Sequence, residues 1–239
     1  LNILHINFDQ FNNLNNNKLQ NYDFICNCSI DKKYQNGKYT VQSDIDLKIV
    51  NKIKDLKIKY IFLSSRKVYK HNANLKESSK CKPLDNYAKN KLITENKIKL
   101  IIKNRYLILR ISNIIGEPIN NPKKVTNNFI DKYLQFKKSK MIIAYKNYYK
   151  DFLSINQFTE IFYNIIRSKI MGTYNVSLGK KVYISEILLW LSKSNNKIFK
   201  PINKFINDDS FYLNNKKLLN KINIKIKKSD LRKYCQNFN

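Results

Sequence analysis

The chain has 239 residues, of which 43% are hydrophobic, and its 46 lysines and arginines against 17 acidic residues give a formal net charge of +29. The apolar share is too high for a disordered chain, and no run approaches the roughly 18 apolar residues of a membrane helix. The length supports one domain with at most a smaller lobe. Four cysteines are too few for a disulfide framework and no leader segment opens the sequence, so we expect a cytoplasmic protein.

The basic charge at first indicates a nucleic-acid partner, because Lys and Arg neutralise phosphates. Only five of the basic residues are arginine, however, and the planar guanidinium is the group best suited to read base edges. The excess of Lys, Asn and Ile, with only four Gly, indicates a composition-wide bias instead. We therefore interpret the lysines as a solvated surface and expect no nucleic acid among the partners.

Apolar periodicity predicts an alternation of strands and helices. In chain order, the predicted elements are strands at 3–8 and 22–28, a helix at 45–53, a strand at 59–63, a helix at about 86–103, a strand at 106–109, a helix at 129–136, a strand at 141–145, a helix at 158–166, a strand at 173–176 and a helix at 184–191. Such alternation is typical of an α/β fold with a largely parallel sheet. Alternating isoleucines at Ile222, Ile224 and Ile226 predict a short edge strand.

Ligands of open parallel sheets bind outside the carboxyl ends of the strands. The polar residues predicted to follow strand ends are Ser64 and Ser65, then Asn27, Cys28 and Ser29, and finally Arg110, Ser112 and Asn113.

Tyr87 and Lys91 lie four apart at the start of a predicted helix, so both project from one face. A lysine ammonium beside a phenol stabilises the phenolate and lowers its pKa, which makes the tyrosine a usable proton donor or acceptor. With a serine hydroxyl nearby, the set predicts a proton-transfer site. Taken alone, this spacing is weak evidence in a chain with 16 tyrosines and many lysines, and an exposed helix pair explains it better.

The spacing of Tyr87 and Lys91 becomes stronger evidence for a proton-transfer site because it belongs to a series of segments in a fixed order. These are 60–69 with Ser64 and Ser65, 83–92 with Tyr87 and Lys91, 109–116, 149–155, 172–176 and 185–187. In this order they resemble the extended short-chain dehydrogenase/reductases, in particular the NAD-dependent nucleotide-sugar epimerases, dehydratases and 4-keto-sugar reductases. The resemblance covers about residues 4–220.

The resemblance implies a Rossmann-like, doubly wound parallel sheet with a smaller C-terminal substrate lobe. Residues 1–112 and 151–178 would form the cofactor domain, and residues 113–150 and 179–239 the lobe. The resemblance also implies NAD or NADP as cofactor, a nucleotide-sugar substrate, a homodimer and no membrane association.

Roles follow from the resemblance residue by residue. Tyr87 would be the catalytic acid/base, Lys91 would bind the nicotinamide ribose, and Ser65 would polarise the substrate. Lys150 stands where the family has an arginine, so the positive charge is kept but the bidentate hydrogen bonding of the guanidinium is lost. The implied cofactor-binding residues are Asp9, Asn27, Cys28, Ser29, Ser64 and Lys91, and the implied substrate-binding residues are Ser65, Asn113, Asn128 and Lys150.

Two departures from the family matter. No glycine precedes Gly37, whereas family members open with a glycine-rich turn for the cofactor pyrophosphate. The strand at 3–8 then matches the family's third strand, so we expect that a βαβ unit of about 30 or more residues is missing. The chain is either a fragment or a shortened homologue. The absent initiator Met favours a fragment. Arg66 and Lys67 replace an acidic pair of the 4,6-dehydratases, which leaves epimerase and 4-keto-sugar reductase.

A second hypothesis is a non-catalytic Rossmann-like binding protein with a degenerate cofactor site, which uses its lysines on a polyanion. Cys26 and Cys28 share one strand face without a second cysteine pair or a suitably spaced histidine, so we interpret them as buried thiols and predict no metal site. His5 and His71 have no evident partners and are interpreted as structural or surface residues.

Overall fold

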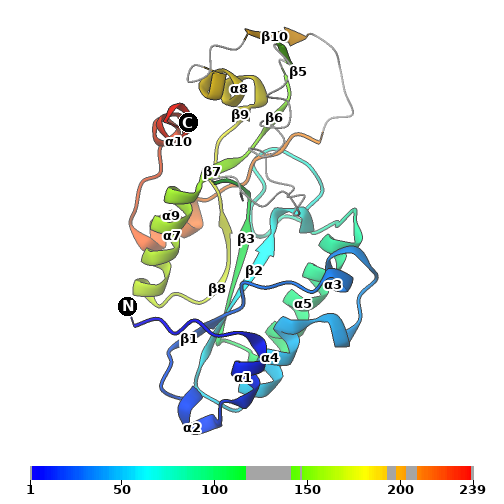
Figure 1. The fold of residues 1–239 in the computed structure, drawn as a ribbon, viewed down its shortest axis with the longest axis vertical. Coiled ribbons are helices and arrows are strands. Elements are labelled where there is room, and N and C mark those ends of the chain that lie inside the picture. Colours follow the sequence, from blue (N-terminus) through cyan, green and yellow to red (C-terminus); the bar gives the residue numbers. More distant parts are fainter. Residues whose placement is uncertain (1, 117–140, 146, 193–197, 203–208, 238–239) are drawn as a thin grey trace.

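A parallel sheet forms the centre of the protein. The computed structural model describes residues 2–116, 141–145, 147–192, 198–202 and 209–237. The sheet has the order β1 (Phe24–Cys26), β2 (Lys59–Ser65), β3 (Tyr106–Ile111) and β8 (Gly172–Val176), and every neighbouring pair is parallel. Figure 1 shows these strands running side by side through the molecule. The α/β fold with a parallel sheet is therefore confirmed.

Helices cover both faces of this sheet (Figure 1). The connections that bring the chain back to a parallel neighbour contain α4 (Ile45–Ile53) between β1 and β2, α5 (Asn86–Ile102) between β2 and β3, and α7 (Ile155–Ser168) between β3 and β8. Helices α4 and α5 lie on one side, while α7 and α9 (Lys216–Ile222) lie on the other. This is a doubly wound arrangement.

The central strands are apolar on both faces because both faces are covered. Successive side chains of a strand point to opposite sides, so each strand contributes to two cores. Burying one such side chain contributes about 1.5–3 kcal/mol. Ile61, Leu107 and Leu109 pack in the core under α7, whereas Tyr60, Phe62 and Ile108 pack in the core under α4 and α5.

Several later elements gather beyond the carboxyl ends of the central strands, at the top of Figure 1. This part contains the antiparallel pair β6 (Tyr149–Lys150) and β9 (Val182–Tyr183), the parallel pair β5 (Met141–Tyr145) and β10 (Ile198–Ile202), and the helices α8 (Ile184–Ser192) and α10 (Lys228–Gln236). Below it, β4 (Asn113–Ile115) pairs in parallel with β7 (Phe152–Ser154). The division into cofactor domain and substrate lobe stays a prediction.

Most predicted elements form within a few residues of their expected bounds. The short helices α1 (Phe8–Asn13), α2 (Asn16–Leu19) and α3 (Lys32–Asn36) were not predicted, and neither were α9 and α10. The helix predicted at 129–136 lies outside the described residues. No helix in the described ranges is long and apolar enough to cross a membrane.

The strand predicted at 3–8 is wrong. Residues 2–7 take part in no strand of the described chain, and helix α1 begins at Phe8. The cause is local capping: the Asn7 side chain accepts a hydrogen bond from the Gln10 N–H at 2.8 Å, and the Gln10 side chain accepts one from the Asn7 N–H at 2.9 Å. This capping box satisfies N–H groups that would otherwise be free at a helix start.

The edge strand predicted from Ile222, Ile224 and Ile226 is also wrong. Ile222 ends helix α9, and the following Asn223 takes a left-handed conformation, φ 51°, that stops the helix. Ile222 and Ile226 are buried because the irregular connection to α10 passes over the core below α7. The alternating isoleucines are therefore explained by burial of this connection, which pairs with no strand in the described residues.

A buried ion pair joins β3 to α5. Arg110 on β3 donates to Glu95 of α5 at 2.6 Å through Nη2 and at 3.0 Å through Nε. Both side chains are almost fully buried. Ser64 of β2 also donates to Glu95, at 2.6 Å. The carboxylate therefore receives hydrogen bonds from two neighbouring strands and fixes the helix against them.

The same arginine extends the network to the far strand of the sheet. Arg110 Nη1 donates to the Tyr69 hydroxyl at 2.7 Å, and that hydroxyl donates to Asn175 Oδ1 of β8 at 2.9 Å. The Asn175 side-chain amide donates to the carbonyls of Leu75 and Asn214. One chain of hydrogen bonds thus runs from α5 across β3 to β8 and to two loops.

Replacing one partner of this pair is expected to destabilise the fold strongly, because the other charge would stay buried without compensation. We expect Glu95→Gln to lower the free energy of unfolding by about 3–5 kcal/mol in urea denaturation. The matched control is Asp23→Asn, which removes the exposed ion pair with Lys169, 3.9 Å apart, and should cost less than about 1 kcal/mol. Equal effects of the two substitutions would contradict this account.

Candidate functional site

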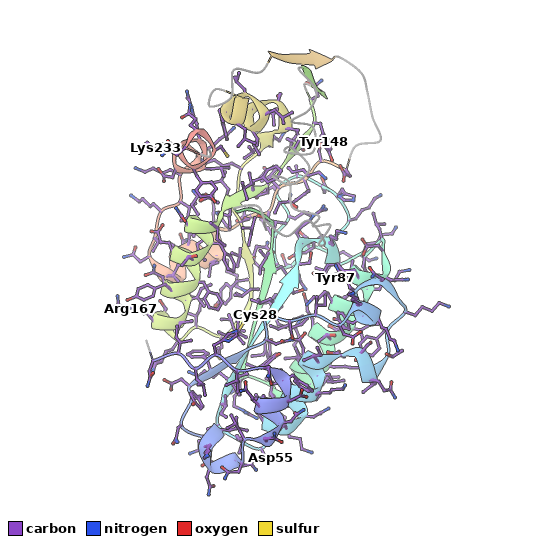
Figure 2. The ribbon with its side chains drawn as sticks, in the orientation of Figure 1. Cys28, Asp55, Tyr87, Tyr148, Arg167 and Lys233 are labelled. Carbon is purple, nitrogen blue, oxygen red and sulfur yellow. The ribbon has the colours of Figure 1, made fainter. Side chains whose placement is uncertain are left out.

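Ser65 and Tyr87 meet at the carboxyl end of β2. Ser65 is the last residue of that strand, and Tyr87 is the second residue of α5. The helix starts there because the Asp85 side chain caps it, accepting from the Ala88 N–H at 2.7 Å. The Ser65 side chain lies close enough to the Tyr87 phenol to lower its pKa. Figure 2 labels Tyr87 at this position.

Lys91 lies one helical turn beyond Tyr87 and is 6% exposed. Its Nζ is 4.5 Å from the centroid of the Phe62 ring, 5.6 Å from that of Tyr34 and 5.9 Å from that of Tyr87. Burial lowers the pKa of this lysine, and the nearby Asp46 carboxylate opposes the shift. The structure therefore brings the three predicted catalytic residues together, with the ammonium held among aromatic faces.

The electrostatics of Tyr87 differ from the sequence-based expectation. Burial raises the pKa of its phenol, and the nearby Ser65 side chain acts in the opposite direction. The carboxylates of Asp85 and Asp46 raise the pKa further, and Lys91 does not lower it as the sequence led us to expect. The raised pKa keeps the phenol protonated at neutral pH.

Asn27, Cys28 and Ser29 form a turn after β1. Asn27 Oδ1 accepts from the Ser29 N–H at 3.0 Å and from its hydroxyl at 2.8 Å, and Asn27 Nδ2 donates to Asp46 at 3.1 Å. These side-chain bonds end the strand at Cys26, two residues short of the predicted bound. All three turn residues line a cavity of about 560 Å³ that runs along β1.

Two predicted cofactor residues lie apart from this group. Asp9 is exposed in the first turn of α1 and is not among the cavity-lining residues. Ser64 is buried, and its hydroxyl donates to Glu95. The side chain of Ser64 therefore belongs to the network around Arg110, whereas that of Ser65 belongs to the site.

The predicted substrate residues lie around the start of β7. Asn113 of β4 donates through its side-chain amide to the Asp151 carbonyl at 3.1 Å. Lys150, which directly precedes Asp151, forms an ion pair with Asp209, and its Nζ lies 3.0 Å from Asp209 Oδ2. The carboxylate of Asp209 also accepts a hydrogen bond from Tyr148, which Figure 2 labels. Asn128 lies outside the described residues.

Sequence reasoning missed a cationic cluster beside Ser65. Arg66 is 8% exposed, its guanidinium lies 3.9 Å from the centroid of the Phe211 ring, and its Nη1 is 3.1 Å from His71 Nδ1. A guanidinium only donates, so His71 accepts at Nδ1. Burial lowers the pKa of His71, and Arg66 lowers it further. The basic pair at 66 and 67 was a signal for this cluster, but nothing marked Phe211 as its partner.

No group of three His, Cys, Asp or Glu side chains with the geometry of a metal site occurs in the described part of the chain. The interpretation of both Cys26 and Cys28 as buried thiols is wrong for Cys28, which is exposed, while Cys26 is half-buried. The chain leaves the strand directly after Cys26, and this turn brings Cys28 to the surface.

Comparisons with known proteins agree with this geometry. Residues 3–177 match the model of the NAD dependent epimerase/dehydratase family. The chain belongs to this family. None of the curated proteins compared with it matches.

Solved structures of three epimerases and reductases share the fold. A UDP-N-acetylglucosamine 4-epimerase from Methanobrevibacter ruminantium M1, in complex with UDP-N-acetylmuramic acid, is 21% identical with a TM-score of 0.71, and the match covers 93% of this chain and 77% of that one. A UDP-glucuronic acid 4-epimerase from Bacillus cereus in complex with NAD is 20% identical with a TM-score of 0.70, covering 94% and 75%. A dTDP-4-dehydrorhamnose reductase from Bacillus anthracis in complex with NADP is 15% identical with a TM-score of 0.70, covering 97% and 84%.

The buried Asp151 joins β7 to two other segments of the chain through its side chain. It is fully buried and accepts backbone hydrogen bonds from Leu178 at 2.9 Å and from Gly179 and Leu213 at 3.1 Å. Burial raises its pKa to about 7, although the three N–H donors favour the charged form. The folded state therefore binds a proton at this carboxyl in a pH range where the unfolded chain has released it.

The sign of the resulting pH dependence follows from that difference in bound protons. Because the pKa is raised on folding, the stability contributed by the protonated carboxyl is fully present below the ordinary pKa of about 4 and is lost as the pH rises through about 7. We expect the free energy of unfolding of the wild type, measured in urea, to fall between pH 5 and pH 7 more steeply than that of Asp151→Asn. Parallel curves for the two proteins would contradict the raised pKa.

Proposed function

We propose that the chain is an NAD(P)-dependent enzyme that transfers a hydride at a sugar carbon of a nucleotide-activated sugar, either as an epimerase or as a 4-keto-sugar reductase. The observation that carries this proposal is the proximity of Ser65, Tyr87 and Lys91 at the carboxyl end of β2, with the Lys91 Nζ 5.9 Å from the centroid of the Tyr87 ring. Family membership and the epimerases and reductases of similar fold support the same reaction class.

The residues present fit the nicotinamide end of the cofactor. Lys91 is a buried ammonium with aromatic neighbours, and its three N–H donors suit ribose hydroxyls. Asn27, Cys28 and Ser29 follow the neighbouring strand and line the cavity along it. A bound nicotinamide supplies the site of hydride donation and acceptance. No glycine-rich turn for a pyrophosphate occurs before Gly37 in the sequence.

Tyr87 is the group we propose to move the proton. Its phenol is half-buried, and the nearby Ser65 side chain lowers its pKa and so favours the phenolate. In this role the serine holds the substrate oxygen beside the phenolic proton. The Ser65 hydroxyl itself accepts from the Lys67 N–H at 3.2 Å, which orients its proton away from the backbone. Lys91 adds a positive charge on the same helix face, which favours the phenolate further.

On the substrate side we propose Lys150 and Asn113 as contacts of the sugar-nucleotide diphosphate. The ammonium of Lys150 pairs with Asp209 in this structure, and the diphosphate would replace Asp209 as its partner. The neighbouring Arg66 adds a second cation close to Ser65. A dehydratase needs an acid to expel a hydroxyl, and Arg66 and Lys67 offer none, which favours epimerase or reductase.

Tyr87→Phe separates proton transfer from binding, because it removes the hydroxyl and keeps the ring. We expect turnover to fall about 10²–10⁴-fold while the affinity for the nucleotide sugar is unchanged. Turnover is measured by chromatography of UDP- and dTDP-sugars with NAD(H) or NADP(H), and affinity by calorimetry. Tyr163→Phe, which alters an exposed tyrosine on α7, is the matched control. Unchanged turnover of Tyr87→Phe would refute the catalytic assignment.

A further inference from the structure

Two cysteine thiols lie together at the carboxyl end of β1. Cys26 is the last residue of the strand and is half-buried, while Cys28 is two residues further and exposed. Their side chains lie close enough for each thiol to shift the pKa of the other, and both line one cavity. Figure 2 labels Cys28 next to the central sheet. The two sulfurs are therefore neighbours, although the reaction proposed above uses neither thiol group.

The turn between the two cysteines holds them in this arrangement. Asn27 accepts two hydrogen bonds from Ser29 and donates one to the buried Asp46. Its side chain thereby fixes the backbone at the point where the chain leaves the strand. The backbone that carries the two thiols is thus held in a fixed turn.

The two thiols have different acidities. The neighbouring Cys26 lowers the pKa of Cys28 to about 6 against the effect of burial, and His5 contributes in the same direction as Cys26. Cys28 in turn raises the pKa of Cys26, and burial adds to this shift. Cys28 is therefore the more acidic of the two thiols, and the thiolate is the nucleophilic form of cysteine.

Both thiols are open to small molecules. Cys26, Cys28 and His5 all line the cavity of about 560 Å³ along β1. The other two cysteines provide a contrast within the chain. Burial raises the pKa of half-buried Cys81 and raises that of fully buried Cys235 to about 12. An exposed, acidic thiol, a second thiol two residues away and an adjoining cavity thus occur at one place.

We propose that Cys26 and Cys28 form a dithiol site that exchanges with low-molecular-weight disulfides. The Cys28 thiolate attacks one sulfur of the disulfide, whose S–S bond breaks, and one small thiolate leaves. A mixed disulfide remains on Cys28. Cys26 then loses its proton to solvent and attacks the Cys28 sulfur, which expels the second small thiolate and closes a Cys26–Cys28 disulfide. Two protein thiols are oxidised and one small disulfide is reduced to two thiols.

The sequence makes this product easy to detect. Trypsin cleavage after Lys18 and Lys32 yields a peptide, 19–32, that contains both cysteines and no other. We treat the folded chain with oxidised glutathione at pH 7, stop the reaction with acid and analyse the peptides by mass spectrometry. In the wild type, peptide 19–32 should lose two hydrogens and carry no glutathione.

Variants separate the attacking thiol from the resolving thiol. Cys26→Ser keeps a hydroxyl donor beside Cys28 and should accumulate one glutathione on Cys28. Cys28→Ser should react at Cys26 at least about ten-fold more slowly than the wild type reacts at Cys28. Cys81→Ser is the matched control and should leave the oxidation of peptide 19–32 unchanged.

Two results would overturn the proposal. One is a wild type that keeps glutathione on Cys28 as stably as Cys26→Ser does, because Cys26 would then not resolve the mixed disulfide. The other is a Cys28 that reacts with glutathione disulfide no faster than Cys81 in the same wild-type protein. This second comparison needs no variant, so it holds even if a substitution prevents folding.

Discussion

The ion pair between Glu95 and Arg110 is the interaction on which the arrangement of the site depends. Glu95 and Lys91 lie one turn apart on α5, and Arg110 ends the buried run of β3. Because Ser64 also donates to Glu95, the carboxylate fixes both strands against the helix that carries Tyr87. A buried charge without its partner is costly, so this network tolerates few alternative positions of the helix. Ser64 thus belongs to the structural network around Glu95, whereas the adjacent Ser65 belongs to the site.

The site gains its chemical character from burial. Lys91 is surrounded by rings and has a lowered pKa, while Tyr87 has a raised pKa and lies beside Ser65. Burial is the largest cause of both shifts. Arg66 adds positive charge next to Ser65, and Lys150 forms an ion pair with Asp209.

Much of this was predictable from long buried segments. The strand at 59–63 and the helix at about 86–103 follow from their apolar runs, and the family resemblance carried by the order of motifs implies the three site residues. The strand at 3–8 failed because a capping box at Asn7 outweighs a short apolar run. The pairing of Lys150 with Asp209 spans 59 residues, and the raised pKa of Tyr87 depends on tertiary burial. Neither leaves a local pattern in the sequence.

The central claim is that the buried ammonium of Lys91 serves a nicotinamide cofactor. Its most direct test is a calorimetric titration of NADH and NADPH into the wild type and into Lys91→Met, which keeps the apolar length of the side chain and removes the charge. The account predicts that at least one cofactor binds the wild type and binds Lys91→Met about ten-fold or more weakly, a difference of about 1.4 kcal/mol. Equal affinity in a folded variant, or binding of neither cofactor to the wild type, would contradict it.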